Sequence, residues 1–287
     1  MPHLMRVSLL TVFAMLAFAG NSLLCRLALK STDIDAASFT LIRLASGALT
    51  LWLIMLGRRT NATGSWASGA ALFVYASAFS FAYINLPAAT GALILFGSVQ
   101  LTMQGYGMAT GDRFSALQIT GLGMALCGLV VLLLPGLEAP SMAGATLMMA
   151  AGIAWGVYSL RGRSDGDPTL ATAGNFIRAL PFAIVLATVM LPQLVVDAAG
   201  IGYAVASGVV TSAIGYTIWY AAVKQLRATT AASVQLCVPA LTAVGGIVFL
   251  DEHLSWTLVL ACIGILFGVA LAVLAGKQNS PGSEQRP

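Results

Sequence analysis

Aromatic and amide side chains recur inside long apolar runs of this sequence, where they are the side chains best suited to bind a small solute. Tyr75, Phe79 and Tyr83 are spaced by four residues, which places them on a single stripe of a helix. Further candidates stand in other apolar runs: Phe18, Asn21, Phe96, Gln100, Trp155, Tyr158, Tyr216, Trp219 and Gln235. Aromatic faces combined with neutral amides suit an amphipathic neutral or zwitterionic solute.

A purely structural role is the alternative for each of these residues. The amides of Asn21, Gln100 and Gln235 would then bond one helix to another, because lipid leaves a polar amide unpaired. The aromatic rings would pack, or form an interfacial belt, as Tyr83 near the end of its run would. The binding hypothesis rests first on Trp155, Asn21 and Tyr83.

Two arginines and two prolines, Pro181 and Pro239, also lie inside apolar runs. Arg43 and Arg178 each stand about two turns inside a run, at matched places in the two halves of the chain. An arginine at the bilayer centre costs roughly 2.5–3.5 kcal/mol. Snorkelling or bonding to backbone carbonyls is one interpretation, and carboxylate binding or gating is the other; their matched places favour a shared structural role. Pro239, one turn after Gln235, should kink a helix and free carbonyls to line a cavity.

The side chains that enzymes need are missing from these runs. The histidines are His3 and His253, both at the ends of runs, so no buried base stands beside a serine and no histidine–carboxylate metal site is formed. No CxxC pair occurs, which argues against zinc and disulfides. We therefore expect no catalytic residue, no metal and no cofactor. No acidic residue lies in the middle of a run, so a facilitator is a simpler expectation than a proton-coupled carrier.

The composition indicates that these runs are surrounded by lipid. Of 287 residues, 59% are hydrophobic and only 8% are charged, whereas a soluble domain is about a quarter charged. The mean hydropathy is +0.90. Nucleic-acid binding is excluded despite the pI of about 9.0, because the 14 basic residues are scattered.

We predict an all-α integral membrane protein with ten spans, since a transmembrane helix needs about 20 apolar residues. The predicted spans are 4–25, 36–57, 66–86, 88–109, 114–135, 140–160, 169–193, 200–223, 228–250 and 255–276. Ala17-Phe18-Ala19 has the pattern of a signal-peptide cleavage site, but the apolar run continues to Leu24, so we expect a retained helix.

The basic residues give the orientation. With the N-terminus in the cytoplasm, the inner loops and tails hold Arg6, Arg58, Arg59, Arg113, Arg161, Arg163, Lys224, Arg227, Lys277 and Arg286. The outer loops hold only Arg26 and Lys30. The positive-inside rule then places both termini in the cytoplasm.

The chain also repeats itself. At an offset of about 140 residues, Thr90-Gly91-Ala92 falls on Thr230-Ala231-Ala232, and Asp112 falls on Glu252. Each half has five spans, an odd number, so the halves enter the membrane in opposite senses. Such inverted repeats are typical of secondary transporters that bind substrate at the repeat interface. We expect repeats at 4–135 and 140–276, followed by a polar tail at 277–287.

Two stretches carry a family resemblance: Gly111-Asp112-Arg113-Phe114 through Gly128, and Asp251-Glu252-His253-Leu254 through Gly268. Each is an acid-bearing turn followed by a glycine-rich final helix, and the halves resemble EamA-type modules of the drug/metabolite transporter superfamily over roughly residues 4–276. Arg43 and Arg178 match the arginine of the second helix in each module. Within the superfamily, Phe-Ala-Gly-Asn at 18–21, Ala-Trp-Gly-Val-Tyr at 154–158 and Tyr83 resemble amino-acid exporters, although Phe18 replaces an expected tryptophan.

The resemblance implies export of aromatic and other neutral amino acids from a bacterial inner membrane. The resemblance also implies that the protein has a central cavity lined by the first, third, fourth, sixth, eighth and ninth spans. Alternating access would open this cavity to each side of the membrane in turn. The partners expected are the amino-acid substrate and the lipid bilayer, with no nucleic acid, and the GxxxG pairs are too weak a signal to predict more than a monomer. The alternatives are efflux of hydrophobic drugs or carriage of another small metabolite, and, from another class, a non-transporting membrane scaffold.

Overall fold

A computed structural model describes residues 3–57, 61–111, 115–133, 140–164, 166–253, 255–256, 259–260, 262–264, 266–268 and 270–271. Within these ranges the chain is helical and contains no strand, so the predicted all-α class is confirmed. The first part consists of α1 (His3–Ser31), α2 (Ala36–Leu56), α3 (Trp66–Tyr83), α4 (Ala88–Ala109) and α5 (Ala116–Leu133). The second consists of α6 (Met142–Gly162), α7 (Pro168–Val189), η1 (Leu191–Gln193), α8 (Ala198–Ala206), η2 (Ser207–Ile214), α9 (Gly215–Val223), α10 (Ala228–Val234) and α11 (Cys237–Leu250).

Several helical segments are long and apolar enough to cross a membrane: Met5–Ser31, Ala36–Leu56, Met142–Gly162, Pro168–Val189, Ala198–Val223 and Ala228–Leu250. The predicted span 88–109 coincides with α4. Buried polar side chains, among them Ser98, Gln100 and Gln104, lower the apolar content of α4, and neither α3 nor α4 is among these segments. The predicted tail at 277–287 and the turn Asp112-Arg113-Phe114 lie outside the described residues.

The first helix is longer than predicted. Its predicted end was residue 25, with Arg26 and Lys30 in an outer loop, but α1 continues to Ser31. Both side chains are bonded to carbonyls on other helices: Arg26 donates to Tyr83 O at 2.8 Å and Lys30 to Leu250 O at 2.7 Å. These contacts stabilise two charged residues within the last turns of a membrane helix.

Side-chain caps fix where several helices begin. Asp35 accepts hydrogen bonds from the amides of Ala37 and Ser38 at the start of α2. Asp197 caps α8 by accepting from the amide of Gly200. Carboxylates at these positions satisfy amides that have no partner within the helix and favour the positive end of its dipole.

The predicted span 200–223 contains a π-helical insertion. η2 (Ser207–Ile214) joins α8 to α9 without a break. On this segment Gly208 lies so close to α2 that a Cβ atom there would be 2.3 Å from Arg43 O. π-Helical turns are rare and recur at functional sites.

The predicted span 228–250 is not one helix. α10 ends at Val234 and α11 begins at Cys237, so the break lies at Gln235 and Leu236. Pro239 is the third residue of α11, where a missing N–H removes no internal hydrogen bond. A proline ring clashes with the carbonyl four residues before it, which for Pro239 is that of Gln235, so the break lies where the predicted distortion by Pro239 would fall. A cavity-lining role for the freed carbonyls stays a prediction.

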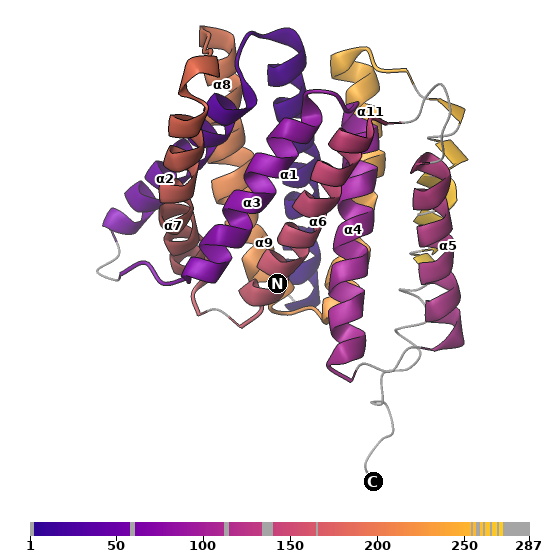
Figure 1. Cartoon of the computed structure of the whole chain (residues 1–287). Helices are drawn as coiled ribbons and strands as arrows, with labels where there is room; N and C mark the ends of the chain where they lie inside the picture. Colours follow the sequence, from indigo (N-terminus) through magenta and orange to yellow (C-terminus); the bar gives the residue numbers. More distant parts are fainter. Residues whose placement is uncertain are drawn as a thin grey trace.

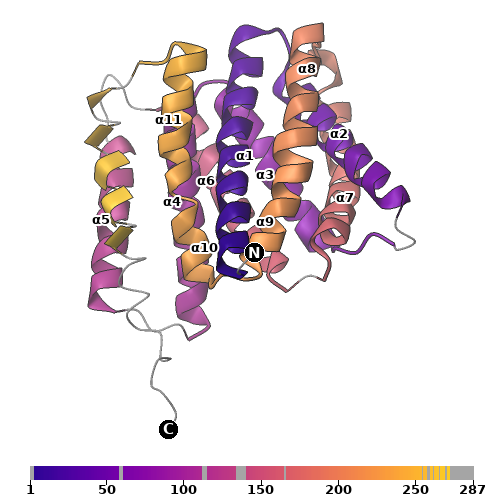
Figure 2. The same ribbon diagram turned by 180° about the vertical axis from the view of Figure 1, so that it is seen from behind.

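The helices form a bundle in which α6 packs against α3 and α4, α2 packs against α7, and α1 packs against α9 and α11 (Figures 1 and 2). A Cβ atom on Gly152 of α6 would be 2.4 Å from Leu95 O of α4. The pair Gly152 and Gly156 thus marks the close helix contact that a GxxxG pattern predicts.

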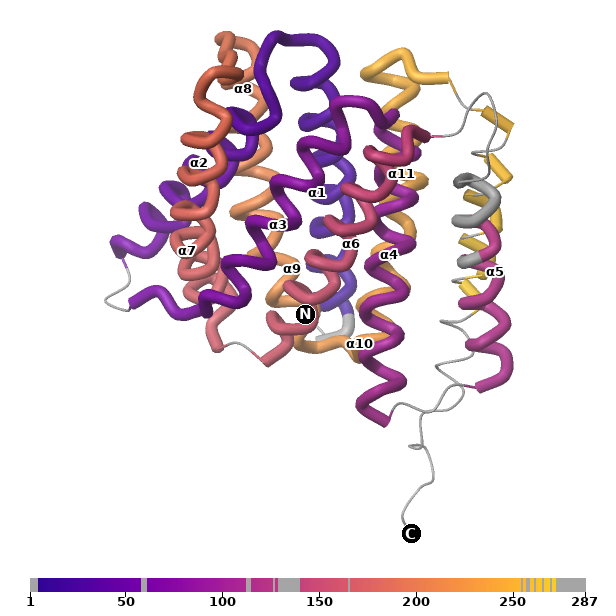
Figure 3. Tube along the Cα trace, viewed as in Figure 1, coloured from indigo at the N-terminus to yellow at the C-terminus, as the bar shows by residue number. Residues whose placement is uncertain are grey.

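α5 lies at the edge of the bundle beyond α4, beside the described residues of the final apolar run (Figure 3). Gly268 in that run lies against α5, since a Cβ atom there would be 2.4 Å from Gly121 O. The residues predicted to bind substrate all lie in the bundle and not in this peripheral pair.

Candidate substrate site

The candidate binding residues come together in the interior of the bundle. α1 brings Phe18 and Asn21, α3 brings Tyr75, Phe79 and Tyr83, α4 brings Phe96 and Gln100, α6 brings Trp155 and Tyr158, α9 brings Tyr216 and Trp219, and Gln235 stands at the break after α10. Each of these side chains is at most 4% exposed. Residues separated by more than 200 positions in the sequence therefore line one interior region.

Trp155 lies at the middle of the rings. Its centroid is 4.6 Å from that of Tyr216, 4.8 Å from Tyr75, 5.1 Å from Phe18 and 5.4 Å from Tyr158. Separations of 4.5–7 Å with tilted or edge-on planes are the favourable geometry for aromatic pairs. The indole thus contacts rings from α1, α3 and α9 as well as one on its own helix.

The ring contacts continue outward from Trp155 on two sides. Phe18 reaches Phe96 at 6.3 Å and Trp219 at 5.6 Å. On α3, Phe79 lies 5.3 Å from Tyr75 and 4.7 Å from Tyr83. We call these rings, together with Phe176, whose centroid is 6.0 Å from that of Tyr216, the aromatic cluster: Phe18, Tyr75, Phe79, Tyr83, Phe96, Trp155, Tyr158, Phe176, Tyr216 and Trp219.

Asn21 is bonded at both ends of its amide. Its Nδ2 donates to the hydroxyl of Tyr75 at 3.0 Å. Its Oδ1 accepts from Ser207 at 2.8 Å and from Thr211 at 3.2 Å. One buried amide thereby connects α1, α3 and the π-helical segment η2.

Gln235 and Gln100 are buried amides in opposite situations. Gln235 Oε1 accepts from the indole of Trp155 at 2.7 Å, and its Nε2 donates to Ala231 O at 3.0 Å. Both polar atoms of the Gln100 side chain are buried without a hydrogen-bond partner. A buried polar group without a partner costs about 1–3 kcal/mol, so Gln100 is the amide most in need of a ligand.

The two arginines lie in different surroundings. Arg43 is fully buried and donates from Nε to Ser212 at 2.9 Å and from Nη2 to the hydroxyls of Tyr75 and Tyr216. Arg178 is only half-buried and donates to Thr63 O at 2.7 Å, in the segment that precedes α3. Each arginine thus bonds its helix to another segment, but with different partners, and a shared structural role stays a prediction.

Sequence reasoning missed some residues of this region. Phe176 of α7 contacts Tyr216 with ring centroids 6.0 Å apart. Ser207, Thr211 and Ser212 on η2 bind Asn21 and Arg43. Their spacing of four and five residues places them on one side of a helix, and hydroxyls grouped in this way are typical of contacts between membrane helices.

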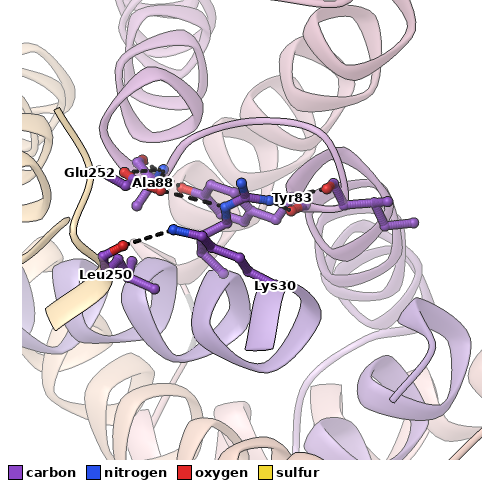
Figure 4. Close-up of polar contacts among 7 residues, drawn as sticks. Lys30, Tyr83, Ala88, Leu250 and Glu252 are labelled. Carbon is purple, nitrogen blue, oxygen red and sulfur yellow. Dashed lines mark hydrogen bonds and ion pairs between the residues drawn. The ribbon is translucent and has the colours of Figure 1, made fainter. Parts of the chain in front are cut away.

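A second polar set joins the bundle at the turn between α3 and α4 (Figure 4). The Glu252 carboxylate accepts from the amide of Ala88 at 2.9 Å and lies 3.4 Å from Nε of Arg26. Arg26 in turn donates to the carbonyls of Tyr83 and Ile84. Glu252 follows α11 and supplies the side-chain cap that Pro87 cannot give to α4, so these contacts connect α1, the α3–α4 turn and the end of α11.

Two relatives match this chain along nearly its whole length, and a third matches part of it. An uncharacterized protein of Pseudomonas aeruginosa is 52% identical over 269 residues, which cover 93% of this chain and 94% of that protein. An uncharacterized transporter of Archaeoglobus fulgidus is 24% identical over 285 residues, covering 93% of this chain and 96% of the transporter. The threonine/homoserine exporter RhtA of Salmonella typhimurium is 29% identical over 126 residues, which are 43% of this chain and 42% of the exporter.

The fold also has a counterpart among solved structures. One crystal structure shares it with a TM-score of 0.72 and 21% sequence identity, over 94% of this chain and 98% of that one. The sequence model of the EamA-like transporter family matches residues 142–274. With a helical bundle, membrane-length apolar helices and an uncharacterized transporter as a relative over nearly its full length, the chain resembles a membrane transporter, and its residues 142–274 match the EamA-like transporter family.

Proposed function

We propose that this protein exports amino acids, aromatic and other neutral ones, across the inner membrane of a bacterium. The observation that carries the proposal is the convergence of the aromatic cluster with Asn21, Gln100 and Gln235 in the interior of a membrane bundle. Rings offer an apolar and polarizable surface to the side chain of an amino acid, and the amides offer neutral donors and acceptors to its polar end. No metal or cofactor takes part in this function.

Transport follows from alternating access in this proposal. Ten spans would be arranged as two inverted repeats, 4–135 and 140–276, with both termini in the cytoplasm. The rings of the cluster contact one another, so a solute enters only when the helices that carry them separate. The contacts of Glu252 with Arg26 and Ala88 would close the outer end, and they would break when the site opens outward.

The kinship with a threonine/homoserine exporter supports export of small molecules in general. The proposed preference for aromatic substrates rests on the rings of the aromatic cluster and is not supported by this relative. Efflux of hydrophobic drugs is the rival, because the same rings would also accept a flat apolar compound.

The deciding experiment is transport by purified protein in liposomes. Vesicles loaded with unlabelled L-phenylalanine or L-threonine are diluted into the labelled amino acid, and exchange is followed with and without an imposed pH gradient. We expect exchange without a proton gradient, since the acidic residues lie at the ends of the predicted spans. If a protonophore abolished exchange, the protein would be a proton-coupled carrier and not a facilitator. Transport of ethidium without transport of either amino acid would favour drug efflux instead.

A further inference from the structure

Arg43 is a fully buried cation whose partners are all neutral. Its hydrogen bonds go to Ser212, Tyr75 and Tyr216, and its Nη1 has no partner. The carboxylate of Glu252 is paired with Arg26, and within the described part of the chain no carboxylate is paired with Arg43. A buried charge is ordinarily paired, because removal from water is costly unless an opposite charge replaces the solvent.

The rings beside Arg43 compensate only part of that cost. The guanidinium carbon lies 5.3 Å from the centroid of Tyr75 and 5.2 Å from that of Phe79, within range for cation–π attraction. These contacts leave the Nη1 donor unused. The missing component is therefore an acceptor, and an anion is the acceptor that matches a guanidinium best.

Arg43 is connected directly to the aromatic cluster. Tyr75 and Tyr216, which accept from its Nη2, have ring centroids 4.8 Å and 4.6 Å from that of Trp155. An anion bound at Nη1 would hold the rest of its molecule beside these rings. A structural arginine would need no such arrangement, as Arg178 shows by binding backbone carbonyls near the surface.

We propose that Arg43 binds the carboxylate of the transported solute and so restricts the substrates to those that carry one. This inference rests on the proposed function and deepens it, because it assigns a chemical handle shared by aromatic and small amino acids. Side-chain selectivity then comes from the rings, while the carboxylate fixes one end of every substrate. Amines and amides of the same shape would lack the charge that Arg43 needs.

The first test is ligand protection of the purified protein against thermal unfolding. L-Phenylalanine and L-threonine are compared with L-phenylalaninamide and L-threoninamide, which replace the carboxylate with a neutral group of similar size. We expect the wild-type protein to need on the order of ten- to a hundredfold more amide than acid for equal protection, as for loss of a charged hydrogen bond. Two results with the wild-type protein alone would overturn the inference: equal protection against unfolding by an amino acid and its amide, or no protection by either amino acid.

Variants then identify the arginine responsible. R43Q should remove the preference for acid over amide while the amide still protects, and R43K should keep part of the preference because the charge remains without the planar fork. R178Q is the matched control, since that arginine binds Thr63 O outside the cluster, and it should keep the full preference. A preference unchanged in R43Q overturns the assignment.

Failure of the proposed function is distinguished by transport in liposomes. Wild-type protein that prefers acids through Arg43 but moves no amino acid would retain this inference and contradict amino-acid export. Wild-type protein that moves amino acids and their amides at equal rates would retain export and overturn this inference.

Discussion

The indole of Trp155 donates a 2.7 Å hydrogen bond to Gln235, and this bond connects α6 to the break between α10 and α11. The same indole contacts Phe18, Tyr75 and Tyr216 through its ring faces and edges. Trp155 therefore takes part in both the polar and the aromatic contacts of the site, and it is the residue whose replacement tests the site most directly.

We expect Trp155→Ala to weaken transport of phenylalanine more than transport of threonine. Stacking and packing of an aromatic solute against this indole should contribute on the order of 1–3 kcal/mol, roughly ten- to a hundredfold in affinity. Initial rates are measured in liposomes per molecule of folded, monodisperse protein. Trp52→Ala is the control, because Trp52 is a half-exposed tryptophan on α2. Normalised rates that fall equally for both substrates, or do not change, would remove Trp155 from the binding site.

Local sequence patterns were sufficient to predict much of the fold and the membership of the cluster. α4 follows from one apolar run, and its bounds match the prediction. Tyr75, Phe79 and Tyr83 lie on one helical stripe because their spacing of four residues matches the helical period. Amides in membrane helices are expected in the interior, since lipid offers an amide no partner.

The features of the fold that the sequence did not predict involve contacts between residues that lie far apart in the chain. The π-helical segment η2 contains Gly208, which closely approaches Arg43, and no local pattern encodes that approach. The extension of α1 depends on acceptors that Tyr83 and Leu250 supply. The cap of α4 is a glutamate 164 residues away in the sequence. Such pairs become visible only when the helices are packed.

Replacement of Asn21 by alanine should lower stability and reduce transport of all substrates alike. Its amide bonds Tyr75, Ser207 and Thr211, and each buried group left unpaired costs about 1–3 kcal/mol. Thermal unfolding in detergent measures the loss, and Asn85→Ala, at an exposed asparagine of the α3–α4 turn, is the control. A variant that unfolds like the wild type but discriminates among substrates would instead make Asn21 a selectivity residue.

Glu252→Ala should destabilise the protein more than Glu252→Gln does. Alanine leaves both the amide of Ala88 and the guanidinium of Arg26 without this acceptor, at a cost of about 1–3 kcal/mol. Glutamine keeps an oxygen for Ala88 and loses only the charge. Asp251→Asn is the control, because residue 251 has a φ of 52°, a left-handed conformation that asparagine tolerates. Equal unfolding temperatures for wild type and Glu252→Ala would show that the contacts of Figure 4 contribute nothing to stability.

Asp35 should make stability depend on pH in the acid range. Burial opposes ionisation of its carboxyl, but hydrogen bonds from Ser38, Val195 and Ala37 outweigh burial and lower its pKa below the usual value. A lowered pKa in the folded state means that the stabilisation is complete above the unfolded pKa, about 4, and is lost as the pH falls through the folded value.

Asparagine is as good a helix cap as aspartate and loses only the charge. Replacing Asp35 with asparagine should therefore lower stability at pH 7 by about 0.3–1 kcal/mol, the usual contribution of a negative charge at a helix N-terminus. The difference from wild type should shrink as the pH falls below about 4. Unfolding temperatures of both proteins are compared across this range. Asp33→Asn, at the exposed neighbouring acid, should have little effect at any pH. A difference that stays constant with pH would assign the effect of Asp35→Asn to packing and not to charge.

The proposed orientation predicts which loops a membrane-impermeant thiol reagent can reach in intact cells. Cys127 and Cys237 are exposed, so the test begins from a variant in which all four native cysteines are replaced. Single cysteines are then placed at exposed positions: Asn61→Cys and Gly166→Cys for the predicted inner side, Gln193→Cys and Val196→Cys for the outer side. The last two should label in intact cells and the first two only after the membrane is opened, because the basic residues gather on the inner side. Labelling in the reverse pattern would show that the protein has the opposite orientation in the membrane, with the Glu252 contacts at the cytoplasmic end.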